Sequence, residues 1–169
     1  PGLYVRMFRH VADIFREEGA DNVLFVFCPN AESVPNTSYD PSAGWNQVAA
    51  YYPGDDYVDV LGMDGYNWGT SRTVARHGWK SSFLSFERIF GNVYRELRSL
   101  SPDKPILVFE TASVALGGDK SAWIRDAVRT ALEWQLSGLA WFQADKELDW
   151  RIQADTDGSY LNALRRASA

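Results

Sequence analysis

Apolar residues recur along the chain in two alternating patterns. Residues 3–18 place Leu3, Met7, Val11 and Ile14 at the spacing of one helical face, with charged residues between them. Short apolar runs bounded by Pro, Gly, Asn or Asp are typical of strands buried on both faces. The sequence predicts strands within residues 22–28, 57–64, 105–113 and 139–143, and helices at residues 3–18, 45–52, 82–99, 120–135 and 160–166.

This alternation predicts an α/β fold with a parallel sheet and right-handed crossovers. Four such strands are half of a (β/α)8 barrel, and a flavodoxin-like or Rossmann sheet is the competing architecture. No glycine-rich phosphate loop follows any of the predicted strands. Polar residues instead follow the four strands in turn, at Asn30, Asp64, Glu110 and Gln143. Barrel active sites are built from such strand ends, so the pattern favours the barrel.

Composition narrows the function classes. The 169 residues suffice for one domain with a core, and 46% of them are hydrophobic. A net charge of -5 argues against nucleic acid or an anionic membrane as a partner. A single cysteine, Cys28, leaves no internal disulfide and no cysteine-based zinc site, and His10 and His77 lack metal-ligand spacing. We therefore expect no metal and no other cofactor.

The acid within the third predicted strand is the strongest catalytic candidate. Glu110 stands where the apolar run stops; the alternative is a strand-end residue that pairs with an arginine or caps a helix. Acyl transfer needs a Ser or Cys beside a His, and neither histidine follows a strand. Glycoside hydrolysis needs two carboxylates, roughly 5–5.5 Å apart in retaining enzymes, and no histidine. Aromatic residues near the strand ends suit sugar stacking: Tyr66, Trp68, Trp141, Phe142 and Trp150.

Several segments resemble glycoside hydrolase family 26, the β-mannanase family. Residues 51–59 and 62–67 resemble the region of its sixth strand, and residues 104–111 its seventh strand. Residues 22–30 are similar to its fifth strand, and residues 118–124 and 141–152 to its closing segments. The resemblance runs through nearly the whole chain in family order. It implies that the fold is the C-terminal half of a (β/α)8 TIM barrel, with parallel strands 5–8 and their helices.

The resemblance also implies roles for individual residues. Glu110 would be the nucleophile, and the Tyr66 hydroxyl would hold its carboxylate charged and aimed. Asp64 would support the site or contact a sugar hydroxyl, although a buried acid there could equally be structural. Trp150 would form a stacking floor and Arg151 would reach sugar hydroxyls; the alternative is a surface salt bridge from Arg151 to Asp149 or Glu147. Trp68 and Trp141 are further substrate-binding candidates, although alternation along a strand turns one residue of each neighbouring pair into the core.

One family feature has no counterpart here. The acid/base glutamate of the family follows the fourth strand in a His-Glu-Met-Asn-like motif, which this sequence lacks. Residues 1–169 are therefore expected to form one partial catalytic domain without the first half of the barrel, inactive by itself. Because open sheet edges and an exposed barrel interior are liabilities, we expect the chain to need its other half or a second copy of itself.

The expected activity is that of a retaining endo-β-1,4-mannanase. Within the family, β-1,3-xylan and mixed-linkage glucan are alternative substrates. An inactive carbohydrate-binding module is a hypothesis of another class, and a different retaining barrel glycosidase is a third. Since polysaccharides are extracellular, we expect a secreted protein whose signal peptide lies outside this chain.

Overall fold

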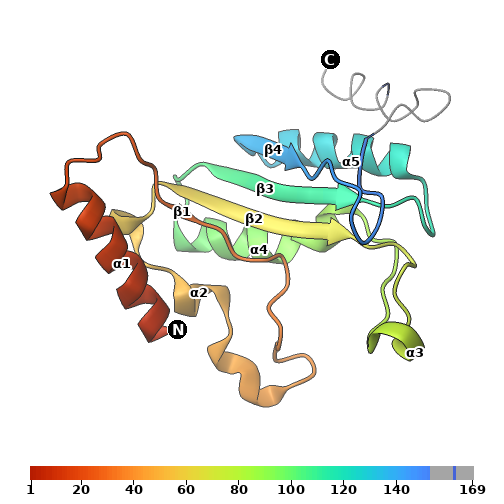
Figure 1. The fold of residues 1–169 in the computed structure, drawn as a ribbon, viewed down its shortest axis with the longest axis horizontal. Coiled ribbons are helices and arrows are strands. Elements are labelled where there is room, and N and C mark those ends of the chain that lie inside the picture. The colour runs from red at the N-terminus through yellow and green to blue at the C-terminus, as the bar shows by residue number, and fades with distance from the viewer. Residues whose placement is uncertain (153–161, 163–169) are drawn as a thin grey trace.

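Four parallel strands form the central sheet of the computed structural model, which describes residues 1–152 and residue 162. The strands lie in chain order: β1 (Val26–Phe27), β2 (Val60–Asn67), β3 (Ile106–Ser113) and β4 (Gly138–Trp141). The helices are α1 (Gly2–Glu17), α2 (Val48–Tyr51), α3 (Val74–His77), α4 (Phe86–Leu100) and α5 (Lys120–Glu133), with 3-10 turns at Pro41–Trp45 and Asp55–Tyr57. Figure 1 shows this succession, which confirms the predicted α/β fold with a parallel sheet.

Most predicted elements are present with shifted ends. β1 has only two residues, whereas the sequence predicted a strand within residues 22–28. The strand is short because the Phe25 amide donates to the Asp59 carboxylate and its carbonyl accepts from the amides of both Asp59 and Val60, which is not the regular pairing of a parallel sheet. β2 begins later than predicted and continues to Asn67. α3 is a short helix that was not predicted. The helix predicted at residues 160–166 lies outside the described residues. Among the described residues, no helix is long and apolar enough to cross a membrane.

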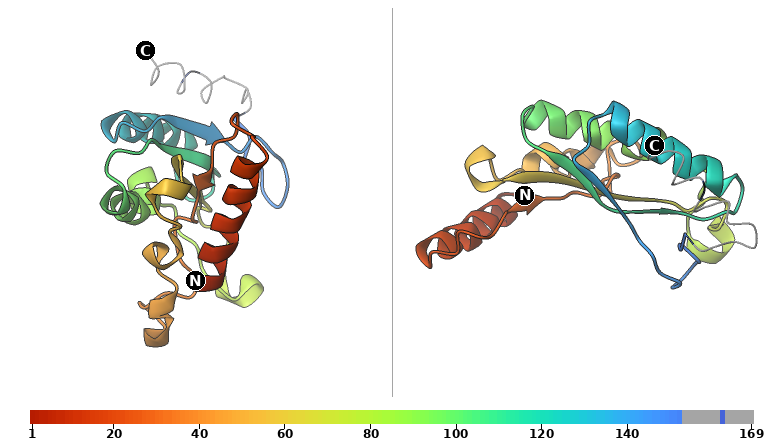
Figure 2. Two further views of the ribbon diagram at one scale, coloured as in Figure 1. Left: turned by 90° about the vertical axis from the view of Figure 1, so that its left-hand side faces the viewer. Right: turned by 90° about the horizontal axis from the view of Figure 1, so that it is seen from above.

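The two long crossover helices, α4 and α5, cover one face of the sheet (Figure 2). Their N-termini are capped by side chains: the Ser85 hydroxyl accepts from the Arg88 amide, and the Asp119 carboxylate accepts from the Ala122 amide. Every second residue of β2, and of β3 as far as Val108, points into this layer. The core that results contains Leu61, Met63, Ile106, Val108, Phe86, Phe90, Val93, Leu97 and Trp123. No described helix covers the opposite face of the sheet along β2 and β3, and that face carries the candidate site.

The apolar side of α1 is only partly covered by the described residues. Phe8 and Phe15 contact Phe25, so the helix packs beside the start of β1. Other apolar residues of α1 face solvent, including Leu3 (74% exposed) and Met7 (53% exposed). This stripe lies at the β1 edge of the sheet, where a fifth strand of a barrel would join (Figure 1).

A β-bulge at Phe109 interrupts the alternation of β3. Along β2, Met63 pairs with Val108 but the next residue, Asp64, pairs with Glu110, so Phe109 has no partner. The pairing with β4 jumps in the same way, from Val108 to Thr111. As a result, Phe109 and Glu110 both lie on the face opposite α4 and α5, and both are exposed. The bulge thus turns Glu110 away from the buried side on which strict alternation from Val108 would place it.

Candidate active site

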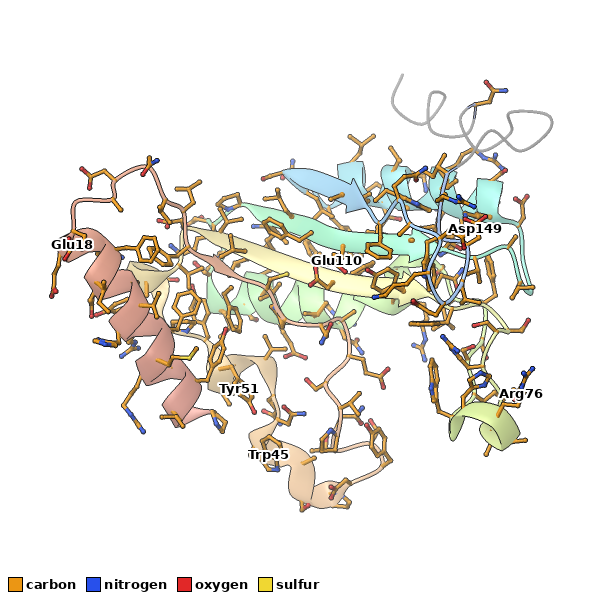
Figure 3. The ribbon with its side chains drawn as sticks, viewed as in Figure 1. Glu18, Trp45, Tyr51, Arg76, Glu110 and Asp149 are labelled. Carbon is orange, nitrogen blue, oxygen red and sulfur yellow. The ribbon has the colours of Figure 1, made fainter. Side chains whose placement is uncertain are left out.

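Glu110 and Tyr66 come together on the open face of the sheet. They lie on neighbouring strands, and the Tyr66 hydroxyl donates a hydrogen bond to a carboxylate oxygen of Glu110. Burial, this hydrogen bond and the charge of Glu110 raise the pKa of Tyr66 above its ordinary value, so the phenol remains a donor. Figure 3 shows Glu110 on the sheet between β2 and β3. The strand continues three residues past Glu110 to Ser113, so the acid lies within β3 and not at its end.

Asp64 is the register partner of Glu110 and stands on the same face. Its Oδ1 accepts a hydrogen bond from the Cys28 thiol, at 3.3 Å. Burial raises the pKa of Asp64, and the charge of Glu110 adds to the rise. Burial and the Asp64 carboxylate together raise the pKa of Cys28, which keeps the thiol protonated and unreactive. Asp64 therefore lies beside Glu110, with its carboxylate bonded to Cys28, the residue that follows β1.

The backbone of Asp64 fixes the segment that follows β1. The Asp64 amide donates to the Pro29 carbonyl at 3.2 Å, and its carbonyl accepts from the Ala31 amide at 2.7 Å. Close approach of the strands is possible at Gly62, where a Cβ would lie 2.6 Å from the Cys28 sulfur and 2.8 Å from Phe109. The face around Glu110 is thus built from three adjacent strands.

Trp150 is placed differently from its predicted role. The ring packs against Tyr66 and Trp68, with centroids 5.1 and 4.9 Å away, and the residue is 0% exposed. A fully buried ring offers no face to a sugar, so this arrangement does not support the predicted stacking floor. Trp150 instead backs the ring of Tyr66 and so holds the donor of the Glu110 hydrogen bond.

A buried lysine anchors the loop that carries Trp150. Lys120, which is 4% exposed, donates from Nζ to the Trp150 carbonyl at 3.2 Å and to the Arg151 carbonyl at 2.9 Å. Burial lowers the pKa of Lys120 to about 8. Trp141, predicted to bind substrate, also donates its indole N–H to the Trp150 carbonyl, at 2.8 Å. In the structure, the Trp141 side chain supports this loop through that hydrogen bond.

Arg151 makes ion pairs with two carboxylates of the same loop. Its side chain contacts Asp149 at 2.8 Å and Asp145 at 3.0 Å. Hydrogen bonds from Arg151 lower the pKa of Asp149. The Asp149 pair is the salt bridge that the sequence left open as an alternative to a sugar contact, and Figure 3 shows Asp149 beyond the ends of β2 and β3. The sugar contact of Arg151 remains a prediction.

Trp68 is half-buried among other aromatic rings and an arginine. The Arg72 guanidinium lies over its ring, 4.5 Å from the centroid, and the rings of Trp150 and Trp79 meet it edge to face. Two exposed aromatic residues near this face were not predicted: Trp79, 45% exposed, and Phe109, 38% exposed. Trp79 lies in a polar loop without a strand-end signal, and Phe109 reaches the site face because of the bulge. No group of His, Cys, Asp and Glu among the described residues could hold a metal ion.

Solved structures identify the class of fold. The chain superposes on a family 26 β-mannanase from Bacteroides ovatus with a TM-score of 0.62 and 22% identity, covering 97% of this chain and 42% of that one. An endo-β-1,4-mannanase double mutant from Cellulomonas fimi gives a TM-score of 0.62 and 18% identity, covering 99% of this chain and 35% of that one. The four-stranded sheet is therefore the C-terminal half of a (β/α)8 barrel.

Sequence comparisons match part of the chain to a family. A model of glycosyl hydrolase family 26 matches residues 1–79. Endoglucanase H of Acetivibrio thermocellus is 40% identical over 168 residues, which are 97% of this chain and 17% of that protein. The first 79 residues thus match glycosyl hydrolase family 26, and the fold of the chain is that of solved mannanases of this family. It spans less than half the length of the solved structures and about a sixth of the curated relative.

Proposed function

We propose that the chain carries the nucleophile side of the active site of a retaining endo-β-glycanase. Glu110 attacks the anomeric carbon and forms a glycosyl ester, while the glycosidic oxygen leaves with a proton from a second carboxylic acid. Water then cleaves the ester, and the second carboxylate accepts its proton. The observation that carries the proposal is the hydrogen bond from Tyr66 to Glu110 on the open face of the sheet.

Tyr66 has two tasks in this scheme. Its hydroxyl occupies one lone pair of the Glu110 carboxylate, which fixes the direction of the other oxygen. Because its pKa is raised, the phenol does not ionise and does not add a negative charge beside the nucleophile. The bond therefore orients the Glu110 carboxylate for attack on carbon.

The proton donor is proposed to be the glutamate that follows the fourth strand in the family, in a motif absent from this sequence. Asp64 does not suit the task, although its pKa is raised. Asp64 and Glu110 are register partners on one face of the sheet, so both would approach the substrate from the same side. In retaining enzymes the two carboxyl groups flank the scissile bond. The chain alone is accordingly proposed to be inactive.

β-Mannan is the first proposed substrate, because the family resemblance and the barrel fold both lead to β-mannanases. β-Glucan is the second candidate, and one observation favours it. The relative with 40% identity is called an endoglucanase, whereas the solved mannanases are 18–22% identical to this chain. That name describes a protein of which the chain matches 17%. The two substrates are therefore compared directly.

The test measures reducing-sugar release from galactomannan and from mixed-linkage β-glucan, by the full gene product and by residues 1–169 alone. Glu110→Ala in the full gene product is the control, with Glu96→Ala, an acid on α4, as the matched variant. We expect activity only in the full product, abolished by Glu110→Ala and kept by Glu96→Ala. Proton NMR of the first product should show retained configuration. Substrate binding without hydrolysis by the full product would favour the carbohydrate-binding module.

A further inference from the structure

We propose that Trp79 forms a sugar-binding subsite distal to Glu110, which stacks a pyranose ring of a β-linked polysaccharide. The inference rests on the proposed function and adds a residue outside the catalytic pair. Trp79 follows α3, which lies beyond the carboxyl end of β2 (Figure 1). Its side chain is 45% exposed although its ring contacts that of Trp68.

A continuous row of rings leads from the nucleophile to Trp79. Tyr66 bonds to Glu110, the Tyr66 and Trp68 rings are 6.3 Å apart, and the Trp68 and Trp79 rings are 5.8 Å apart. The first two rings of the row are packed from behind by Trp150. Trp79 is the exposed end of this row.

The stacking face belongs to Trp79 and not to Trp68. Arg72 lies over the Trp68 ring, and two tryptophan rings meet Trp68 edge to face. Trp79 meets Trp68 at an interplanar angle of 82°, an edge contact that leaves indole surface open. The axial C–H groups of a pyranose pack on such a surface, and the neighbouring guanidinium of Arg72 supplies N–H donors for hydroxyl groups.

The loop that presents Trp79 is held in shape. At its neck the Arg72 amide donates to the Ser81 hydroxyl at 3.0 Å, and the Ser81 amide donates to the Arg72 carbonyl at 3.3 Å. The buried Asn67 side chain accepts from the Gly69 amide at 3.2 Å and from the Leu84 amide at 3.0 Å. A platform fixed in this way loses little conformational entropy when a sugar binds.

The position of the loop also explains why Trp79 stays exposed in a larger barrel. β2 already has a neighbour on each side, β1 and β3, so further strands join the sheet at β1 and β4. The loop after β2 is thus separated from both open edges by a strand with its own loop. The exposed ring of Trp79 is therefore assigned to substrate and not to the rest of the barrel.

The test compares Trp79→Ala and Trp79→Phe with the unaltered full gene product, on the polysaccharide that it hydrolyses and on a short oligosaccharide of the same linkage. Leu132→Ala, an exposed apolar residue on α5, is the matched control. We expect Trp79→Ala to lower kcat/KM on the polysaccharide about three- to tenfold, from the loss of one aromatic contact, with Trp79→Phe in between. The short substrate and the control should be unaffected.

A second readout is independent of turnover. The affinity of the Glu110→Ala form for long oligosaccharides should fall by the same factor when Trp79→Ala is added, by calorimetry. Unchanged affinity and kcat/KM in Trp79→Ala, with an active parent, would overturn the subsite and leave the proposed function standing. Equal losses on short and long substrates would also overturn it. A parent that neither binds nor hydrolyses any β-glycan overturns both.

Discussion

The Tyr66 hydroxyl donates a hydrogen bond to the Glu110 carboxylate, although 44 residues separate the two in the chain. Two neighbouring parallel strands bring them together, and the bulge at Phe109 decides that they face each other. The chemistry of the site thus depends on a local irregularity of β3 as much as on the identity of the two side chains.

Removing the hydroxyl tests its role as a positioning group. Tyr66→Phe should lower kcat/KM of the full gene product about ten- to a hundredfold, because a hydrogen bond to a charged group contributes about 1.5–3 kcal/mol. Steady-state kinetics on the hydrolysed polysaccharide checks this, with Tm as the control for folding. Activity within twofold of the parent at equal Tm would show that Glu110 needs no such partner.

Deleting Phe109 should remove the bulge and restore strict alternation in β3, with Glu110 directly after Val108 and still on the open face. Val108, Glu110 and Thr111 keep their register partners on β2 and no carboxylate is buried, so the deletion variant should fold with a urea midpoint close to that of Phe109→Ala. Phe109→Ala keeps the extra residue and should fold, because Phe109 is 38% exposed. A deletion variant that fails to fold, while Phe109→Ala folds, would contradict this account of the bulge.

Lys120 should make stability depend on alkaline pH. Burial lowers its pKa from the ordinary 10.5 to about 8, with Asp149 opposing the shift and Arg151 adding to it. Between these two values the unfolded chain holds a proton that the folded chain has lost, so raising the pH favours the folded state. The free-energy cost of burying the charged Lys120 side chain is fully present below pH 8 and disappears by about pH 10.5.

Urea unfolding of the full gene product and of Lys120→Met, measured from pH 7 to pH 10.5, checks this expectation. The difference in unfolding free energy, parent minus variant, should rise across the window. A flat difference would mean that Lys120 titrates alike in both states.

Substitution of Arg151 distinguishes a structural role of this residue from a sugar-binding role. Exposed ion pairs contribute little to stability, so Arg151→Ala should leave Tm nearly unchanged. If Arg151 also reaches sugar hydroxyls, kcat/KM should fall about tenfold, as for the loss of one hydrogen bond from a charged group. Arg129→Ala, another exposed arginine that pairs with two acids, is the control. A lower Tm with unchanged kcat/KM would mean that Arg151 acts only through its ion pairs.

The exposed stripe of α1 predicts that residues 1–169 expressed alone self-associate or aggregate. Leu3 and Met7 would otherwise face water, and an unpartnered apolar stripe favours association. Light scattering after gel filtration should show oligomers at micromolar concentration, and the double substitution Leu3→Glu, Met7→Glu should shift them towards monomer. A monodisperse parent that unfolds cooperatively would refute the prediction.

The order of strands and helices followed from the sequence because each apolar run has a distinct period and clear ends. The Glu110 and Tyr66 pair was expected from the family resemblance, whereas the direction of Glu110 was not derivable. The bulge at Phe109 appears only when the register of both neighbouring strands is known. The burial of Trp150 was not predictable for a similar reason, since it depends on Tyr66 and Trp68, which are distant in the chain. A buried lysine such as Lys120 has no signature in a sequence.

The side chain of Asn67 fixes both ends of the segment between residues 69 and 84, so the sequence between them can change without moving those ends. It accepts from the amides at both ends of that segment and donates to the Ser113 hydroxyl of β3. Both ends are therefore fastened to the sheet whatever lies between them, and a change in loop length adds only a small closure entropy. Insertions and substitutions there can accumulate without disturbing Tyr66 or Glu110. Under the proposed function, the polysaccharide bound at this segment can therefore change during evolution while Tyr66 and Glu110 are kept.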